Sequence, residues 1–270
     1  MKKARVVEDG TVYDATESDD GNVVLADGRL VAPEDVAWLP PLAPVTRPRT
    51  ILALGLNYAD HASELAFKPP EEPLVFIKSE GALIGHRAFT PRPADVTFMH
   101  YECELAVVIG RTAKHVKRAD ALDFIGGYTI ANDYALRDYL ENWYRPNLRV
   151  KNRDGCTPLG PWLVDAQDIH ARPGGPMNLA LQTLVNGNVT QSGNTKDMIF
   201  DVPFLIEYFT RFMTLEPGDV ILTGTPHGTV NCQVGDLVMT AIEGIGALES
   251  TIAAQHDAVF QKMTAAAVDH

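Results

Sequence analysis

The sequence has few cysteines, no long apolar run and no excess of basic charge. Cys103, Cys156 and Cys232 are far apart and lack the spacing of a metal site, so we expect three reduced thiols. No stretch approaches the roughly 20 apolar residues that span a bilayer. Polar and charged residues follow Met1–Lys3, where a secretory signal would have its apolar core. We therefore expect a cytoplasmic protein that does not insert into a membrane.

Acidic residues outnumber basic ones. The 35 Asp and Glu residues against 23 Lys and Arg residues give a net charge of -12. A surface of this sign repels nucleic acids and anionic lipids. The 270 residues can bury a sizeable core, and 46% hydrophobic with 21% charged residues is typical of a globular protein. The expected partner is a small molecule, with no nucleic acid and no membrane.

The first 48 residues differ in pattern from the rest. Up to about Trp38, short alternating runs are separated by Asp-Gly and Gly-Asn turns, which predicts a meander of hairpins. The proline-rich stretch Leu39–Pro48 cannot form regular ladder hydrogen bonds and is typical of a linker. We predict a small N-terminal β appendage with its linker over residues 1–48 and a main domain over residues 49–270.

The main domain has many short β-type runs punctuated by Gly and Pro. The predicted strands are Ile51–Gly55, Leu74–Lys78, Tyr101–Gly110, Gly126–Ala131, Leu179–Val185, Asp219–Thr223 and Asp236–Ile242. The predicted helices are Asn57–Glu64, Asp133–Tyr144 and Lys196–Met213. Because strands and helices do not alternate regularly, we predict a β-rich α+β fold with a mixed sheet, rolled or barrel-like. The Ala-rich tail after Ile252 is expected to fray.

Three carboxylates are placed where they could hold a metal ion. Glu102 and Glu104 share one face of a strand because successive side chains alternate. Asp133 follows a second apolar run, and a third carboxylate would complete an all-oxygen site for Mg²⁺ or Mn²⁺ rather than zinc. The alternative is a solvated acidic face, with Asp133 as a helix N-cap. Cys103 lies between the glutamates, but alternation turns it away from them, so we expect it to be buried packing.

A histidine and a glutamate have the spacing of a proton-transfer pair. His61 and Glu64 are three residues apart, which places them on one face of the predicted helix. A neighbouring carboxylate fixes the tautomer of an imidazole and raises its proton affinity, as a general base near neutral pH requires. The alternative is an ordinary surface contact between the two side chains.

Six motifs resemble the fumarylacetoacetate hydrolase superfamily in unbroken order: Gly55–Glu64, Tyr101–Leu105, Ala131–Asp133, Pro158–Trp162, Thr223–Pro226 and Glu243–Gly246. The resemblance spans about Ile51 to Ile252. Within the family, Leu54–Phe67 and Arg137–Lys151 are similar to the C-terminal half of the decarboxylase/isomerases of homoprotocatechuate (4-hydroxyphenylacetate) degradation.

The resemblance implies a β-rich roll in which Glu102, Glu104 and Asp133 hold a divalent metal, Mg²⁺ or Mn²⁺, with Ca²⁺ also conceivable. It implies that a lid carrying His61 and Glu64 closes over a 2-oxo acid. It further implies a homodimer that pairs through the β-rich core. Pairing with a paralogous N-terminal-type subunit is a second arrangement, in which the isolated chain is not catalytic.

Four further residues are candidates for substrate contacts. By resemblance, Lys151 lies beside the metal, where an ammonium can stabilise developing negative charge, and Lys78 lies near the pocket. Arg137, one helical turn after Asp133, would point the same way, unless it simply pairs with that carboxylate. Thr225 lies in a Gly-Thr-Pro turn whose N–H groups and hydroxyl can hold a carboxylate, although a purely structural turn fits equally well.

One position separates this chain from hydrolytic family members. They commonly carry Arg-Asp-Leu-Gln after the metal Asp, whereas Leu140 takes the Gln position here, and a leucine cannot place a water molecule. This position disfavours hydrolysis, and the resemblance then implies a decarboxylase and isomerase acting on 5-carboxymethyl-2-oxohex-3-ene-1,7-dioate and 2-hydroxyhepta-2,4-diene-1,7-dioate. The alternatives are an acylpyruvate hydrolase, an oxaloacetate tautomerase or decarboxylase, and the non-catalytic subunit.

Overall fold

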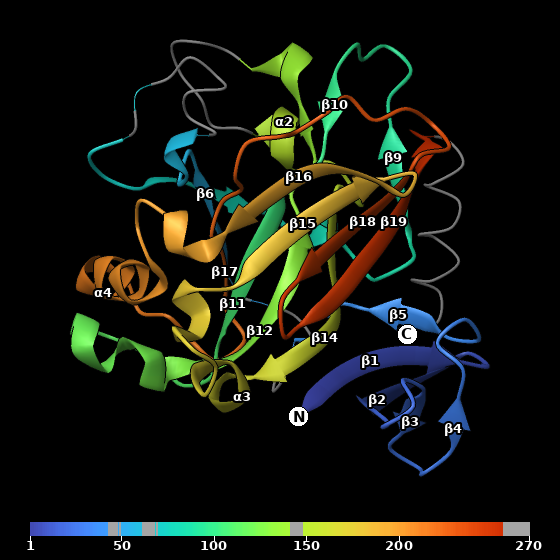
Figure 1. The fold of residues 1–270 in the computed structure, drawn as a ribbon, viewed down its shortest axis with the longest axis horizontal. Helices are drawn as coiled ribbons and strands as arrows, with labels where there is room; N and C mark the ends of the chain where they lie inside the picture. Colours follow the sequence, from blue (N-terminus) through green and yellow to red (C-terminus); the bar gives the residue numbers. More distant parts are fainter. Residues whose placement is uncertain (43–47, 49, 61–67, 69, 141–147, 256–270) are drawn as a thin grey trace.

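Strands dominate the fold. A computed structural model describes residues 1–42, 48, 50–60, 68, 70–140 and 148–255 (Figure 1). Within these ranges, no helix is long and apolar enough to cross a membrane.

The larger sheet has 12 strands among the described residues. Ten of them lie in the order β4 (Leu30–Val31), β3 (Val23–Leu25), β2 (Thr11–Glu17), β1 (Lys2–Glu8), β14 (Thr157–Asp165), β12 (Ile125–Asn132), β11 (Cys103–Ile109), β17 (Val220–Leu222), β6 (Ile51–Gly55) and β7 (Leu74–Lys78). β5 (Ala37–Leu39) pairs with β1, and β8 (Leu83–Ile84) pairs with β14. The sheet is mixed, because β17 runs parallel to β6 and β8 runs parallel to β14.

The smaller sheet has five strands in the part of the chain that is described, in the order β16 (Asn188–Asn194), β15 (Ala180–Val185), β18 (Leu237–Ile242), β19 (Gly246–Ala254) and β9 (Phe89–Arg92). A separate ribbon joins β10 (Met99–His100) to β13 (Ala135–Leu136). In Figure 1 the smaller sheet lies across the strands β11, β12 and β14. Contacts of β14 with β19, β12 with β18 and β11 with β15 join the two layers, and apolar side chains fill the space between them.

The β11–β12 pair is buried on both faces, which explains its apolar sequence. Every residue of β11 is buried, and its side chains contribute to two apolar clusters. The two strands approach closely at their connected end, where a Cβ added to Gly110 would lie 2.6 Å from the Cα of Gly126. The close approach therefore requires glycine at this end of the pair.

The helices are short and lie at the edges of the sheets. The α-helices are α2 (Leu148–Lys151), α3 (Ala166–His170) and α4 (Val202–Phe212), and the 3₁₀ helices are η1 (Glu80–Ala82), η2 (Arg118–Phe124), η3 (Arg137–Tyr139), η4 (Gly175–Met177) and η5 (Thr195–Asp197). In α4 the Asp201 side chain caps the backbone N–H of Phe204, and Pro203 occupies the first turn. These two residues explain why α4 begins at Val202 and not at the predicted Lys196.

The predicted β-rich fold is confirmed, and each predicted main-domain strand is present with its bounds shifted by at most two residues. The pattern missed the longer strands β14, β16 and β19. Each contains Gly, Pro or Asn residues that usually interrupt a strand. β14 and β19 also pair with the distant strands β1 and β9, whereas β16 forms a tight hairpin with β15. β19 continues past Ile252 to Ala254, and the rest of the tail lies outside the described residues from 256 onward.

The predicted helix Asp133–Tyr144 is wrong over its described part. The backbone N–H of Asp133 donates to the carbonyl of Glu102, and that of Tyr134 donates to the carbonyl of Cys156. β13 and η3 follow. In a helix starting at Asp133, the N–H of Arg137 would bond to the Asp133 carbonyl, but it donates instead to the carbonyl of Phe98, so the helix does not form. Of the predicted helix Asn57–Glu64, residues 61–64 lie outside the described part of the chain.

The N-terminal hairpins are continuous with the larger sheet, because Lys2 and Lys3 of β1 pair with Val164 and Leu163 of β14. A boundary at residue 48 stays a prediction. Near this contact, the Trp38 ring packs edge-on against both His86, at 5.2 Å between ring centroids, and Trp162, at 5.0 Å. We call these three side chains the tryptophan–histidine junction.

Candidate metal centre

Strand register brings the three predicted carboxylates together. β11 and β12 are antiparallel, with Cys103 opposite Asn132, so Glu102 lies opposite Asp133 at the end of the pair. Alternation then places Glu104 on the same face as Glu102. One oxygen from each carboxylate lies within 4.8 Å of the others. We call Glu102, Glu104 and Asp133 the carboxylate cluster.

Two lysines from other elements contact the cluster. Lys78, at the end of β7, places Nζ 2.5 Å from Asp133 Oδ1 and donates to the backbone carbonyl of Lys151. Lys151, at the end of α2, places Nζ 2.6 Å from Glu102 Oε2 and 3.0 Å from Asp133 Oδ2. Both ammonium groups are buried, and Asp133 lies between them. Three carboxylates thus face two cations, which leaves one negative charge in excess.

Two oxygens of the cluster are suited to a further cation. Glu104 Oε1 is buried and accepts no hydrogen bond from the described residues, and buried Asp133 Oδ2 has only the Lys151 ammonium beside it, at 3.0 Å. A buried carboxylate oxygen without a donor is costly. A hard divalent ion accepts oxygen ligands of this kind, so the residues present fit such a metal.

The buried charges shift two pKa values. Burial, reinforced by the Asp133 and Glu102 carboxylates, raises the pKa of Glu104 above its usual range. Burial alone would lower the pKa of Lys151, but the Asp133 and Glu102 carboxylates outweigh it and raise that pKa. Lys151 therefore stays an ammonium, as charge stabilisation at the cluster requires.

The Gly-Thr-Pro turn holds a carboxylate that belongs to the protein. The backbone N–H of Gly224 donates to Glu104 Oε2 at 2.5 Å. Gly224 has φ +88°, and an added Cβ would lie 2.8 Å from the Cβ of Asn57, so only glycine fits. The Thr225 hydroxyl is buried and accepts from Gln191 Nε2 at 3.0 Å. A substrate contact of Thr225 stays a prediction.

Arg137 does not share a helix with Asp133, contrary to the prediction, because β13 separates the two residues. Its guanidinium instead packs over the Phe98 ring and donates to Thr229 Oγ1 at 3.1 Å. Arg137 Nε is buried without an acceptor among the described residues, so a donor remains for an anion. Its substrate contact stays a prediction.

Cys103 is buried packing, as predicted. Its side chain belongs to the main apolar cluster, and burial raises the pKa of its thiol. All three cysteines are free and buried. Sequence reasoning missed His100, whose Nδ1 lies 3.7 Å from Glu102 Oε1, although its place two residues before Glu102 was a usable signal.

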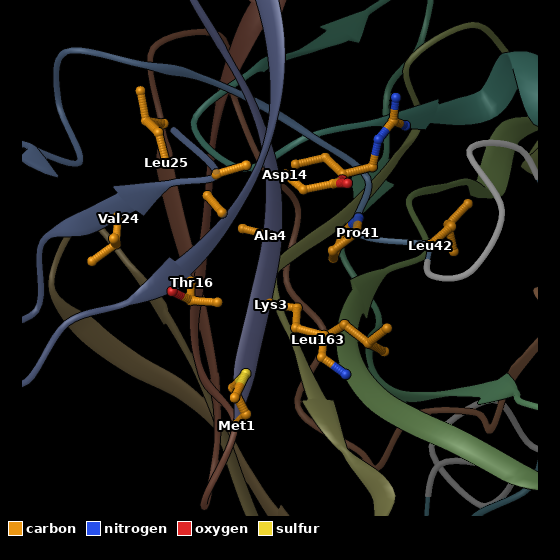
Figure 2. Close-up of a pocket in the computed structure, with 13 residues that line it drawn as sticks. Met1, Lys3, Ala4, Asp14, Thr16, Val24, Leu25, Pro41, Leu42 and Leu163 are labelled. Atoms are coloured by element: carbon orange, nitrogen blue, oxygen red, sulfur yellow. The ribbon is translucent and has the colours of Figure 1, made fainter. Parts of the chain in front are cut away.

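The proposed proton-transfer pair, His61 and Glu64, lies outside the described residues. Leu140, the residue at the family's Gln position, ends η3 and is half-buried. A cavity of about 400 Å³ lies elsewhere, between strands β1 to β3 and the segment Pro41–Leu42 (Figure 2). Its lining includes none of the carboxylate cluster, so it is not the metal centre.

Comparison with known proteins agrees with this geometry. Residues 50–253 match the family model described as "Fumarylacetoacetate (FAA) hydrolase C-terminal". The chain belongs to the fumarylacetoacetate hydrolase family. It is 51% identical over 237 residues to the 4-hydroxyphenylacetate degradation bifunctional isomerase/decarboxylase of Salmonella dublin, covering 88% of this chain and 53% of that protein. The chain therefore spans about half the length of the bifunctional family members it matches.

Solved structures of similar sequence superpose over most of the chain. The 5-carboxymethyl-2-hydroxymuconate delta-isomerase of Mycobacterium smegmatis has a TM-score of 0.79 at 37% identity, covering 94% of this chain and 99% of that one. The fumarylpyruvate hydrolase of Pseudomonas aeruginosa, solved with Mn²⁺ and pyruvate, has a TM-score of 0.69 at 29% identity, covering 77% and 90%. A family structure with a divalent metal supports a metal at the carboxylate cluster.

Proposed function

We propose that the chain decarboxylates 5-carboxymethyl-2-oxohex-3-ene-1,7-dioate and isomerises 2-hydroxyhepta-2,4-diene-1,7-dioate in 4-hydroxyphenylacetate breakdown, with Mg²⁺ or Mn²⁺ as cofactor. The observation that carries the proposal is the buried carboxylate cluster, in which Glu104 Oε1 has no partner among the described residues and two ammonium groups lie beside the other carboxylates. The similarity to the bifunctional isomerase/decarboxylase and to the delta-isomerase indicates which 2-oxo acids to test first.

The carboxylate cluster would hold the metal ion. A hard divalent cation bound there supplies a Lewis acid for the 2-oxo and carboxylate oxygens of a chelating substrate. Lys151, at the edge of the cluster, donates to a substrate oxygen on which negative charge develops. Lys78 donates to Asp133 and to the Lys151 carbonyl and so holds both groups in place, which leaves one of its three donors for the substrate contact that the sequence predicts.

Decarboxylation breaks the bond from carbon to the leaving carboxyl group, and the electron pair moves into the conjugated 2-oxo system as CO₂ leaves. Isomerisation moves a proton from the enol oxygen to carbon. Both reactions need a stabilised enolate oxygen and one proton carrier. We assign the first task to Lys151 and the second to His61, with Glu64 as its partner.

The decisive experiment incubates the purified chain with the tricarboxylic substrate, the dienol, an acylpyruvate and oxaloacetate, each with Mg²⁺ and with a chelator. We expect metal-dependent CO₂ release and loss of dienol absorbance. His61→Ala should retain metal binding and slow the proton-transfer step by about 10² to 10⁴. Rapid acylpyruvate cleavage without CO₂ release would instead support a hydrolase, the function that the similarity to the fumarylpyruvate hydrolase favours.

We also propose that the chain acts as a homodimer. Because it matches about half of the bifunctional relatives, the competing arrangement is a pair with a paralogous N-terminal-type subunit. Mass measurement in solution, with activity assayed before and after adding such a subunit, separates the two. A monomer that is active only after the addition would overturn the homodimer.

A further inference from the structure

A chain of buried polar side chains links the two sides of the carboxylate cluster. Five side chains on four strands and one turn contact one another in the order Asn132, Thr240, Thr183, Gln191 and Thr225. Each is at most 2% exposed. Asn132 directly precedes Asp133 in the sequence. Thr225 directly follows Gly224, whose backbone N–H donates to Glu104. Of these five residues, only Thr225 has been assigned a predicted role, as a contact of the substrate.

The amide of Gln191 can have only one orientation. Its Nε2 lies 2.7 Å from the backbone carbonyl of Pro226, which can only accept. Nε2 must therefore face this carbonyl, and its second hydrogen is directed at Thr225 Oγ1, 3.0 Å away. Oε1 then faces Thr183 Oγ1 at 3.0 Å and must accept from it. The network thus fixes which end of the amide is which.

The polarity of the remaining contacts follows. Thr183 uses its only proton on Gln191, so at the 3.3 Å contact with Thr240 the Thr240 hydroxyl must donate. Thr240 can then only accept from its other neighbour, which agrees with the 2.8 Å bond from Asn132 Nδ2. Every donor in the chain therefore points toward Thr225, and the bonds reinforce one another.

The direction of the chain determines what Thr225 can do. Because its hydroxyl oxygen accepts from Gln191, its proton must go to a different partner. Among the described residues, no acceptor contacts this hydroxyl. The neighbouring Gly224 N–H contacts Glu104, so Thr225 lies at the cluster. A buried hydroxyl proton beside a candidate metal centre is suited to an oxygen acceptor on a bound ligand.

Two glycines allow β16 to approach the turn closely enough for these bonds. A Cβ added to Gly193 would lie 2.7 Å from Pro226 Cγ, and one added to Gly228, at φ +102°, would lie 2.7 Å from the Thr190 carbonyl. Gly193 therefore lies against the Pro226 ring, and Gly228 lies against the backbone of Thr190, so strand and loop are in close contact on both sides of Gln191. The amide reaches the turn from a rigid support, as a positioning group requires.

We infer that Gln191 is a positioning residue that fixes the Thr225 hydroxyl as a hydrogen-bond donor to an oxygen of the bound 2-oxo acid. Because the acceptor belongs to the substrate, this role rests on the proposed function. Gln191 itself touches neither the substrate nor the carboxylate cluster.

A double-mutant cycle tests whether Gln191 acts through Thr225. Binding of 2-oxoheptanedioate to the Mg²⁺-loaded chain is measured by calorimetry for wild type, Gln191→Met, Thr225→Val and the double variant. Each single change should weaken binding by about tenfold or more, the usual effect of a hydrogen bond to a charged group. In the Thr225→Val background, Gln191→Met should add less than about twofold. Equal losses in both backgrounds would overturn the inference.

Two further variants separate hydrogen bonding from side-chain bulk. Gln191→Glu keeps the shape but, once ionised, cannot donate to Pro226 or Thr225, so it should lose at least as much affinity as Gln191→Met. Gln182→Met removes an exposed amide from the neighbouring strand β15 and should bind like wild type. In steady-state assays the loss should appear in KM for both Gln191 variants, with kcat changed less. Binding by Gln191→Glu at the wild-type level would contradict the proposed polarity.

Neutron diffraction of the wild-type protein tests the geometry without a variant or a ligand. The expected result is deuterium on Gln191 Nε2 facing the Pro226 carbonyl and a Thr225 hydroxyl deuterium directed away from Gln191. A Thr225 deuterium directed at Gln191 would overturn the inference. If wild type and Gln182→Met both fail to bind any 2-oxo acid, the proposed function and the substrate role of Gln191 fail together. In that case the diffraction result shows only whether the polarity of the chain was derived correctly.

Discussion

The carboxylate cluster and the tryptophan–histidine junction both bury ionisable side chains, but those of the cluster are charged and the histidine of the junction is neutral. At the cluster, Lys78 and Lys151 supply charges of opposite sign within hydrogen-bond distance. At the junction, no carboxylate among the described residues contacts His86. Its Nδ1 accepts the backbone N–H of Glu249 at 3.0 Å, which requires a neutral ring nitrogen. Burial, followed by the nearby Arg87 charge, lowers the pKa of His86 to about 3.

The difference shows that the neighbouring groups determine whether a buried ionisable side chain is charged or neutral. A charge kept inside a protein needs a counter-charge and hydrogen bonds, and removing one partner leaves the other uncompensated. A neutral buried group has no such dependence until the pH charges it. The four changes below test the comparison in order of decreasing effect.

Removal of the central carboxylate should have the largest effect. Asp133→Asn leaves Lys78 and Lys151 facing each other with less negative charge, so the free energy of unfolding should fall by about 3–5 kcal/mol. Calorimetry should detect no Mg²⁺ or Mn²⁺ binding, because a charged ligand is lost from a hard-ion site. Metal binding at the wild-type level would show that Asp133 does not hold the metal.

Removal of one lysine should destabilise the chain and leave metal binding intact. Lys78→Met should lower the free energy of unfolding by about 3 kcal/mol, because Asp133 keeps only Lys151 as its counter-charge. Added Mg²⁺ should raise the melting temperature more than it does for wild type, since a dication replaces the missing positive charge. An equal rise in both proteins would mean that the metal and Lys78 do not share Asp133.

The junction should respond to acid. Between pH 6.5 and about 3 the unfolded chain binds a proton at His86 that the folded chain excludes. The free energy of unfolding therefore decreases as the pH is lowered, and His86 contributes up to about 1.4 kcal/mol of this decrease per pH unit. His86→Asn keeps an acceptor but cannot be protonated, so urea melts should show a flatter pH dependence. His115→Asn, at an exposed histidine, serves as the control. Parallel curves for wild type and His86→Asn would contradict the assignment.

A surface pair should have the smallest effect. Lys2 and Glu17 form an ion pair between β1 and β2 at 2.8 Å, with both side chains more than a quarter exposed. Glu17→Gln should change the free energy of unfolding by less than about 1 kcal/mol, and 0.5 M salt should remove most of the difference. A loss comparable to that of Lys78→Met would mean that burial does not set the strength of an ion pair in this protein.

The sequence predicted the elements better than their contacts. Apolar alternation located the main-domain strands, and the spacing of Glu102 and Glu104 was enough to place them on one face. Lys78 and Asp133 are 55 residues apart, and their contact depends on the order of strands in the sheet, which no local pattern encodes. The helix expected after Asp133 failed for the same reason, because the distant Phe98 carbonyl accepts from the N–H of Arg137. The Gln191 chain depends on the register of β12, β15, β16 and β18, so it too could not be predicted.

In the β11–β12 hairpin, the connection between the strands and the carboxylate cluster lie at opposite ends. Residues 110–124 join the two strands at one end, and the carboxylates lie at the other. Ala113, Val116 and Ala121 of this connection are buried in the main apolar cluster, so added residues must enter at its exposed positions, where they cost about 0.6 kcal/mol of loop-closure entropy for each doubling of length. The exposed part of the connection is therefore a suitable place to insert a reporter peptide or an affinity tag, because it lies far from the carboxylate cluster.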